Sequence, residues 1–425
     1  MVVCDLRIED VVAPTTGGGR QTVGAMDRET SGQMFRVNSL TLVRRILFGQ
    51  RSARSIGDEA KALGAKRVLL VTDPGVVKSG VLVEVIEGLQ GRNMEVQLFS
   101  DVEPEPDIET ADQVTRTVRG GEFDFVCGVG GGSAMDIAKI ASVMATNPGE
   151  TRQYAGVGLL KKPGLPKVLV PTTAGTGSEM TANALIGLHE EGTKVGVISP
   201  YVLADIAVVD PMLALTLPAK PTASSGLDAL THAIESYISL DANPITSLLS
   251  LQAMKLITHN LLTATFEGGN LQARSAMSLS AMMAGISIAN AGTCSGHAAA
   301  YVYATKYRIP HGISVAVALP YILEFNLTTC PEKGRAIAEA MGVTTSGLSS
   351  AETATNVAQA VLSLMKKVQC PVSLVQLGVP KTEITNIARN MLKMTRLMVH
   401  NPRPMNESKA VNVITKMWEG SIGRG

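Results

Sequence analysis

A run of glycines, Gly128-Val129-Gly130-Gly131-Gly132-Ser133, stands between an apolar segment and a segment with helical periodicity. Residues 123–129 predict a buried strand, and residues 134–145 predict a helix. Glycine lets backbone amides approach a phosphate closely, and the amides at the start of a helix carry partial positive charge. We therefore expect a strand, a turn and a helix in which the turn accepts a pyrophosphate. The spacing does not match G-x-G-x-x-G, so it does not indicate an ordinary Rossmann fold.

Short apolar runs alternate with helical segments on both sides of this turn. Strands are predicted at 67–72 and 95–99, and helices at 77–89 and 109–118. Strands that are buried on both faces and joined by helices indicate a parallel sheet with helices on each side. Beyond the cluster of prolines at 211–221 the helical signals dominate. We expect a Gly/Thr-rich leader at 1–35, an α/β dinucleotide-binding domain at 36–215 and an all-helical domain at 216–425.

The composition bounds the kind of protein. The 425 residues include 45% hydrophobic and 18% charged residues, enough for two large cores. A net charge of +1 and the absence of a dense Lys/Arg stripe indicate no nucleic-acid or membrane-surface partner, so a small molecule is the expected substrate. No stretch near twenty residues is continuously apolar, so no membrane span is predicted. Five scattered cysteines and acidic residues near the N-terminus indicate a cytoplasmic protein.

Asp228, His232, His297 and His311 have the composition of a site for a divalent cation. Asp228 and His232 are four residues apart in a helical run, so their side chains project from one face of one helix. His297 opens a second predicted helix, which Pro310 ends. His311 follows this break, where its side chain can turn back toward the same centre. These residue types serve zinc, cobalt, nickel and iron alike.

A polar loop follows the apolar run 168–170. Its sequence, Pro171-Thr172-Thr173-Ala174-Gly175-Thr176-Gly177-Ser178-Glu179, offers several hydroxyl groups and two glycines to an anionic or ribose-bearing ligand. The glycine-rich turn also follows a predicted parallel strand, and ligands gather at the carboxyl ends of such strands. We therefore expect the two loops to share one ligand.

Four segments together resemble the iron-containing (group III) alcohol dehydrogenase family. They are GGGSAMDIAK (130–139), PTTAGTGSE (171–179), GLDALTHAIESY (226–237) and GHAAAY followed by IPHG (296–312). The resemblance extends from about Val37 to the C-terminus. It implies a dinucleotide-binding α/β domain, an all-helical metal-binding domain of the architecture shared with dehydroquinate synthase, and a cleft between them for NAD(P) and Fe²⁺.

The resemblance also implies roles for individual residues. Asp228, His232, His297 and His311 match the metal ligands of the family, with Zn²⁺ or another divalent metal as the alternative to iron. The positions that match its cofactor contacts are Asp73, Gly131, Gly132, Ser133, Thr172, Thr173, Thr176, Thr181 and Lys194. Asp73 matches an aspartate that accepts from the adenosine ribose. Because a carboxylate there would repel a 2′-phosphate, NAD is favoured over NADP.

One position departs from the common pattern of the family. Many members have a histidine four residues after the one that matches His297, and this chain has Tyr301. A tyrosine with an ordinary pKa near 10 is a poor base at neutral pH. We hypothesise that Tyr301, with a cofactor ribose hydroxyl and water, moves the proton beside His297. The branch of the family that acts on hydroxy acids such as 4-hydroxybutyrate carries tyrosine here.

The expected activity is metal-dependent, NAD-linked alcohol oxidation or aldehyde reduction by a homo-oligomer, a dimer or larger. A hydroxy-acid dehydrogenase of the same family is the first alternative. A dehydroquinate synthase-like lyase is the second; only Lys306 and Arg308 supply basic charge near the metal motifs, which disfavours it. A scaffold without turnover is the third. His189, His259 and His400 lie outside the motifs and are expected to be ordinary surface or core residues, and Cys294 is expected to pack without binding metal.

Overall fold

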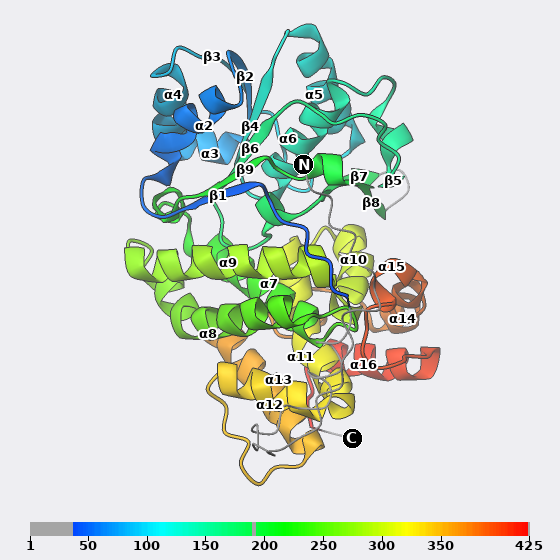
Figure 1. Cartoon of the computed structure of the whole chain (residues 1–425). Helices are drawn as coiled ribbons and strands as arrows, with labels where there is room; N and C mark the ends of the chain where they lie inside the picture. The colour runs from blue at the N-terminus through cyan, green and yellow to red at the C-terminus, as the bar shows by residue number, and fades with distance from the viewer. Residues whose placement is uncertain (1–36, 189–192, 424–425) are drawn as a thin grey trace, which may run out of the picture. The chain divides into compact units, whose positions relative to one another are not determined.

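The computed structural model describes residues 37–188 and 193–423, and Asn38–Gly425 form one compact unit (Figure 1). The expected leader, residues 1–35, and His189 lie outside the described residues. The strands are β1 (Arg45–Phe48), β2 (Arg67–Val71), β3 (Glu95–Phe99), β4 (Phe125–Gly130), β5 (Gly156–Val157), β6 (Lys167–Pro171), β7 (Asn183–Leu188), β8 (Thr193–Ile198) and β9 (Ile206–Val209). The predicted strands at 67–72, 95–99 and 123–129 correspond to β2, β3 and β4.

Six of these strands form one sheet in the order β1-β9-β6-β4-β2-β3, and every neighbouring pair is parallel. The helices between its strands are α2 (Ile56–Ala62), α3 (Pro74–Ser79), α4 (Leu82–Gln90), α5 (Ile108–Gly120) and α6 (Gly132–Met144). The other three strands form a small sheet, β5-β8-β7, in which β7 and β8 are antiparallel. This hairpin was not predicted from the sequence.

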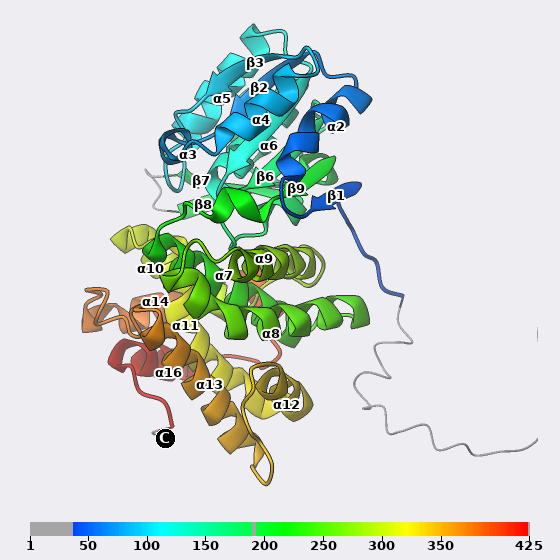
Figure 2. The ribbon, with the colours of Figure 1, turned by 90° about the vertical axis from the view of Figure 1, so that its left-hand side faces the viewer.

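Helices cover both faces of the large sheet, because successive side chains along a strand point to opposite faces and are apolar on both (Figure 2). Val68 and Leu70 of β2 belong to a core that includes residues of α2 and α4. Leu69 and Val71 belong to a different core that includes residues of α5 and α6. Successive side chains of a strand point to opposite faces, so a strand that is apolar at every position must be buried on both.

The single helix predicted at 77–89 is wrong. The structure has two helices there, α3 and α4, with Gly80 between them at φ 77°. Glycine adopts this left-handed conformation without the steric cost of a Cβ, and it ends helices for that reason. Val76 of α3 and Leu82, Val85 and Leu89 of α4 belong to the same core, which is why the periodicity continues across the break.

From residue 219 onward the chain is helical. Its helices are α7 (Ala219–Ile238), α8 (Pro244–Phe266), α9 (Leu271–Ala291), α10 (Ser295–Tyr307), α11 (His311–Asn326), α12 (Pro331–Ala340), α13 (Ser350–Lys367), α14 (Ile384–Lys393), α15 (Thr395–Met398) and α16 (Glu407–Glu419). Short 3-10 turns are η2 (Ser52–Ser55), η3 (Thr151–Tyr154), η4 (Ser178–Met180), η6 (Pro200–Val202), η7 (Pro211–Ala214), η8 (Leu327–Thr329) and η9 (Lys381–Glu383). The predicted fold class, a parallel α/β part followed by a helical part, is confirmed. We keep residue 215 as the proposed domain boundary.

The helical part has its own core, in which α11 is central. Residues His311–Thr329 have the length and hydropathy of a membrane-crossing helix, but 72% of the apolar window is buried inside the protein. Val315, Leu319 and Leu323 of α11 belong to the core cluster that also contains residues of α7, α10 and α13. Its apolar character is therefore accounted for by contacts within the protein.

Three loops that follow neighbouring strands lie at one edge of the large sheet. Asp73 follows β2, the turn 131–133 follows β4, and the loop 172–178 follows β6. Because β4 lies between β2 and β6 and all three are parallel, their carboxyl ends meet at the same edge. This edge is where parallel α/β sheets bind ligands.

Candidate metal centre and cofactor cleft

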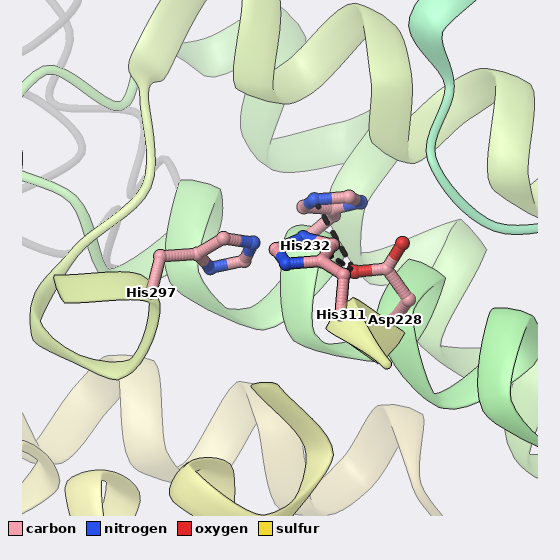
Figure 3. Close-up of side chains that lie close together, drawn as sticks. All are labelled: Asp228, His232, His297 and His311. Atoms are coloured by element: carbon pink, nitrogen blue, oxygen red, sulfur yellow. Dashed lines mark ion pairs between the residues drawn. The ribbon is translucent and has the colours of Figure 1, made fainter. Parts of the chain in front are cut away.

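Four side chains predicted as metal ligands converge in the helical part (Figure 3). Asp228 and His232 lie one turn apart on α7, His297 lies in the first turn of α10, and His311 is the first residue of α11. One donor atom from each lies within 4.8 Å of every other. The break predicted between His297 and His311 is present: α10 ends at Arg308 in the left-handed conformation, and Pro310 then precedes α11.

The polar atoms of this cluster lack the partners that buried groups need. Nε2 of His232 lies 3.5 Å from Oδ1 of Asp228, and Nε2 of His311 lies 3.7 Å from the same oxygen; both are too long for hydrogen bonds. Within the described residues, Asp228 Oδ1 and His297 Nε2 are buried without a hydrogen-bond partner. Buried polar atoms are rarely left unpaired. A carboxylate and three imidazoles left in this state fit a divalent cation.

Burial keeps two of the imidazoles in the form that binds a cation. It lowers the pKa of His232, against a smaller opposing effect of Asp228. Burial also holds the pKa of His311 well below its ordinary value, and the neighbouring His297 and Lys194 act in the same direction. A neutral imidazole keeps a nitrogen lone pair free, which a metal ligand requires.

Glu235 orients His297, and sequence reasoning missed it. Nδ1–H of His297 donates to Oε2 of Glu235 at 2.6 Å, which directs Nε2 toward the other donors. Glu235 also accepts from the backbone amides of Cys294 and Gly296. Burial raises the pKa of Glu235, but the hydrogen bond from His297 and those from the amides outweigh it, so the pKa is lowered. The sequence feature that could have indicated Glu235 is its spacing. It lies three residues after His232 and seven after Asp228, on the same face of α7.

Cys294 packs as expected. It is buried and precedes α10, and its thiol donates to the backbone oxygens of Glu235 and His400.

Tyr301 lies one turn after His297 on α10. Its ring centroid is 5.5 Å from that of His311, on which it stacks, and 6.1 Å from that of His297. Burial raises the pKa of Tyr301 to about 12, so its hydroxyl stays protonated at neutral pH.

The glycine-rich turn and the polar loop pack against each other. The helix α6 begins at Gly132, so the amides of its first turn point out of the turn after β4. A Cβ on Gly132 would lie 2.9 Å from Cγ2 of Thr176, so a side chain there would clash with the polar loop. Thr173 lies within 4 Å of the position of a Cβ on Gly131. The absence of side chains therefore allows the two loops to meet.

The other threonines predicted to line the cofactor are Thr181 and Thr172. Thr181 Oγ1 accepts from the buried ammonium of Lys139 and donates to the backbone oxygen of Ser178. Thr172 is buried, and its backbone amide donates to the backbone oxygen of Gly130. The hydroxyl of Thr181 is therefore already occupied within the protein.

Asp73 caps a helix as well as facing the glycine turn. Its Oδ1 accepts from the amides of Gly75 and Val76 at the start of α3. Its Oδ2 lies 3.2 Å from where a Cβ on Gly130 would stand. One carboxylate oxygen is thus occupied by the cap and the other lies beside the turn.

Lys194 is held by Glu105, which sequence reasoning also missed. Oε2 of Glu105 pairs with Nζ of Lys194 at 2.9 Å, and Oε1 accepts from the backbone amide of His311 at 3.0 Å. The amide of Glu105 donates to Oγ of Ser133. Glu105 adopts φ 55°, an uncommon conformation for a residue with a side chain. It therefore connects the glycine turn, β8 and the start of α11.

A cleft of about 340 Å³ joins these groups. Of the predicted site residues, those that line it are Gly132, Ser133, Thr176, Thr181, Lys194, His232, His297, Tyr301 and His311. Those outside its lining are Asp73, Gly131, Thr172, Thr173 and Asp228. Three of the four predicted metal ligands, the imidazoles, thus face the same cavity as the start of α6.

The cleft also contains residues that no motif indicated. Arg396 of α15 and His400 just beyond it line the wall. Lys306, expected to supply basic charge near the metal, instead pairs with Glu383 outside the cleft. Among the described residues, the lysine and arginine that line it are Lys194, which pairs with Glu105, and Arg396.

Comparisons with known proteins agree with this arrangement. The sequence models of "Iron-containing alcohol dehydrogenase" and of the C-terminal part of the same family match residues 43–211 and 222–418. A long-chain-alcohol dehydrogenase of Geobacillus thermodenitrificans is 38% identical over 86% of this chain and 92% of its own length. A solved 1,3-propanediol oxidoreductase superposes with a TM-score of 0.87 at 36% identity, over 90% of this chain and 100% of its own.

A third relative was solved with its cofactor. Sulfoacetaldehyde reductase from Bifidobacterium kashiwanohense, in complex with NAD⁺, has a TM-score of 0.82 at 28% identity and covers 90% of this chain and 99% of its own. Sequence families and solved structures therefore point to the same relatives.

Proposed function

Because the chain belongs to the iron-containing alcohol dehydrogenase family, we propose that it interconverts a small alcohol and its aldehyde, with NAD as the hydride carrier and Fe²⁺ in the centre. The observation that carries this proposal is the convergence of four donor atoms within 4.8 Å, in a cleft also lined by Gly132 and Ser133. The names of the relatives in the comparisons include long-chain-alcohol and 1,3-propanediol enzymes, which support an alcohol but not one particular alcohol.

The metal is held by Asp228, His232, His297 and His311 in this proposal. Bound there, a divalent cation would supply Lewis-acid chemistry, which lowers the pKa of a substrate hydroxyl or polarises a carbonyl. Glu235 keeps Nε2 of His297 directed at the centre by accepting from its Nδ1. Nitrogen and oxygen donors do not separate iron from zinc, so iron rests on the family.

The dinucleotide lies along the carboxyl edge of the sheet. Gly131, Gly132 and Ser133 hold the pyrophosphate with the amides at the start of α6. The residues that line the rest of the cofactor are Thr172, Thr173, Thr176 and Thr181, while Lys194 reaches a ribose. Asp73 accepts from the adenosine ribose through Oδ2, which favours NAD over NADP because a carboxylate repels a 2′-phosphate.

Tyr301 passes the proton between the substrate oxygen and solvent. Its phenol keeps its proton at neutral pH, so it serves as a hydrogen-bonded relay with a cofactor ribose hydroxyl and water rather than as a base. Its ring stacks on His311, beside the centre.

A test of the activity is the formation of NADH from a panel of primary alcohols, diols and hydroxy acids, with Fe²⁺ added anaerobically. Net NADH is expected with the natural protein and is lost in His311→Ala, together with stoichiometric iron binding. His259→Ala, on the exposed surface of α8, is the matched control and keeps both. A lyase would return its NAD unreduced and a scaffold would leave it untouched, so the absence of net NADH with every substrate contradicts the proposal.

We also propose that the protein is a cytoplasmic homo-oligomer. Cys127 and Cys294 are free and buried, which suits a reducing compartment. The helix α8 exposes Ile245 and Leu248 near its start, and neighbouring apolar side chains on a surface favour association. Light scattering after size exclusion should give a dimer or larger, and Leu248→Glu should shift it toward monomer.

A further inference from the structure

One wall of the cleft carries a positive charge that no residue of the described part of the chain pairs with. Arg396 lines the cleft from α15 and is exposed at its edge. Within the described residues, no hydrogen bond or ion pair involves its guanidinium. Most other arginines on helices of this part have partners: Arg389 pairs with Glu407, and Arg335 pairs with Glu332.

The other charges of the cleft are already balanced. Lys194 pairs with Glu105, whose second oxygen accepts from the amide of His311. Asp136 accepts from Lys139, from the hydroxyl of Ser178 and from the amide of Leu185. Once these groups are paired, the guanidinium of Arg396 is the charge that remains for a ligand.

Arg396 stands in a polar group of the wall. His400 lies four residues later and lines the same cleft, and its Nδ1 pairs with Asp241 at 2.7 Å. A Cβ on Gly292 would lie 2.8 Å from Cδ2 of this ring, so the imidazole packs directly on the glycine backbone. Thr293, the next residue, adds a hydroxyl that makes no hydrogen bond within the described residues. A fixed imidazole, a hydroxyl and a free guanidinium therefore share one wall.

This wall lies at the metal end of the cleft. The helix α15, which carries Arg396, packs against α10, which carries His297 and Tyr301. The ring of Tyr301 in turn stacks on His311. A substrate whose oxygen reaches the four donors would thus extend toward Arg396.

Resting on the proposed function, we propose that the substrate is an ω-hydroxy acid or the corresponding aldehyde acid, whose far end carries an oxyanion bound by Arg396. The planar guanidinium matches a carboxylate with two parallel hydrogen bonds, and such charge-assisted bonds are the strong ones. Sulfonate shares this chemistry.

The test compares charged and neutral substrates of equal length. Turnover is measured with 3-hydroxypropionate, 4-hydroxybutyrate and 5-hydroxypentanoate against 1-propanol, 1-butanol and 1-pentanol, with 2-hydroxyethanesulfonate as the sulfonate arm. We expect kcat/KM to be at least about tenfold higher for the anions, and Arg396→Gln to lower it about 10- to 100-fold for the anions alone, mainly through KM. Arg396→Lys should recover part of the loss, and Arg389→Gln should change nothing.

A binding measurement without turnover accompanies it. The enzyme with NADH cannot oxidise an alcohol, so the Kd of 4-hydroxybutyrate for this complex, read from NADH fluorescence, reports recognition alone. Arg396→Gln should raise this Kd by a similar factor. An equal Kd in both proteins, a preference of the natural enzyme for the alcohols, or a rise confined to the KM for NAD would each overturn the inference while leaving the dehydrogenase activity in place. If no compound is oxidised, the proposed function fails, and the Kd still decides whether Arg396 binds the anion.

Discussion

Glu235 accepts a hydrogen bond from Nδ1 of His297 at 2.6 Å, and both side chains are at most 2% exposed. Both oxygens of this carboxylate act as acceptors, because Oε1 also accepts from the amide of Gly296 and Oε2 from that of Cys294. An amide in place of the carboxylate would have to turn its NH₂ group toward one of these donors.

Glu235→Gln should therefore weaken metal binding. Loss of a partner that orients a metal-bound histidine typically lowers affinity about 10- to 100-fold. Iron or zinc binding to the metal-free protein, followed by equilibrium dialysis and metal analysis, measures the change directly. Glu339→Gln, exposed on α12, is the control. Equal affinities in the two variants would show that Glu235 does not position the ligand.

Asp73→Ser should shift the cofactor preference toward NADP. Serine still caps α3, so the helix start that Asp73 now holds is retained while the negative charge is removed. The ratio of kcat/KM for NADP to that for NAD should rise at least about tenfold. Asp107→Ser, which makes the same exchange at the cap of α5, should leave the ratio unchanged. A constant ratio in both variants would exclude Asp73 from cofactor selection.

Tyr301→Phe should lower kcat about 10- to 100-fold, the range of a positioned proton donor, with little change in the KM for NAD. Because burial raises the pKa of this phenol to about 12, it does not titrate near neutral pH, and the shape of the pH profile should stay the same. Tyr307→Phe, at the far end of α10, is the control. An unchanged rate would remove Tyr301 from the proton path.

Gly285→Ala tests the packing between the polar loop and α9. A Cβ on Gly285 would lie 2.8 Å from Cα and from the backbone oxygen of Gly177, which itself has φ 59°. Backbone cannot yield as a flexible side chain does, so we expect destabilisation of about 1–3 kcal/mol. Denaturant unfolding measures it. Gly120→Ala has no atom within 4 Å of the new Cβ and should be neutral or slightly stabilising.

Glu179→Gln should change how stability depends on pH. Burial raises the pKa of Glu179 from 4.5 to about 7, so the folded state holds the proton more tightly than the unfolded chain. The stabilisation is complete below pH 4.5 and is lost as the pH rises through about 7. Between pH 5 and 8 the variant should gain stability relative to the natural protein, on the order of 3 kcal/mol. Glu87→Gln, exposed on α4, should show no such trend.

Local patterns predicted those parts of the molecule that depend on neighbours in sequence. The strands β2 and β4 were predicted because their residues are apolar on both faces, and Asp228 with His232 because one helical turn separates them. The break at Gly80 was missed because the apolar periodicity runs through it. The hairpin of β7 and β8 was missed because its pairing is set by tertiary contacts rather than by a strong turn signal.

Other parts of the site depend on contacts between distant segments. Glu235 meets His297 across 62 residues, and Lys194 meets Glu105 across two different connections of the sheet. Arg396 and His400 belong to no motif, and only the packing of α15 brings them to the cleft. Periodicity reports which face of an element is buried, but it does not report which polar residues on separate elements will meet.

Glu105 touches both halves of the machinery, through Ser133 and Lys194 on one side and the amide of His311 on the other. A ligand that shifts the Glu105 carboxylate at Lys194 also alters its hydrogen bond to the amide of His311, and the reverse holds as well. Equilibrium linkage makes such an influence mutual: the factor by which the cation changes the affinity for the dinucleotide equals the factor by which the dinucleotide changes the affinity for the cation. Titrating each in the presence and absence of the other would measure that shared factor, and removing the Glu105 carboxylate should bring it toward one.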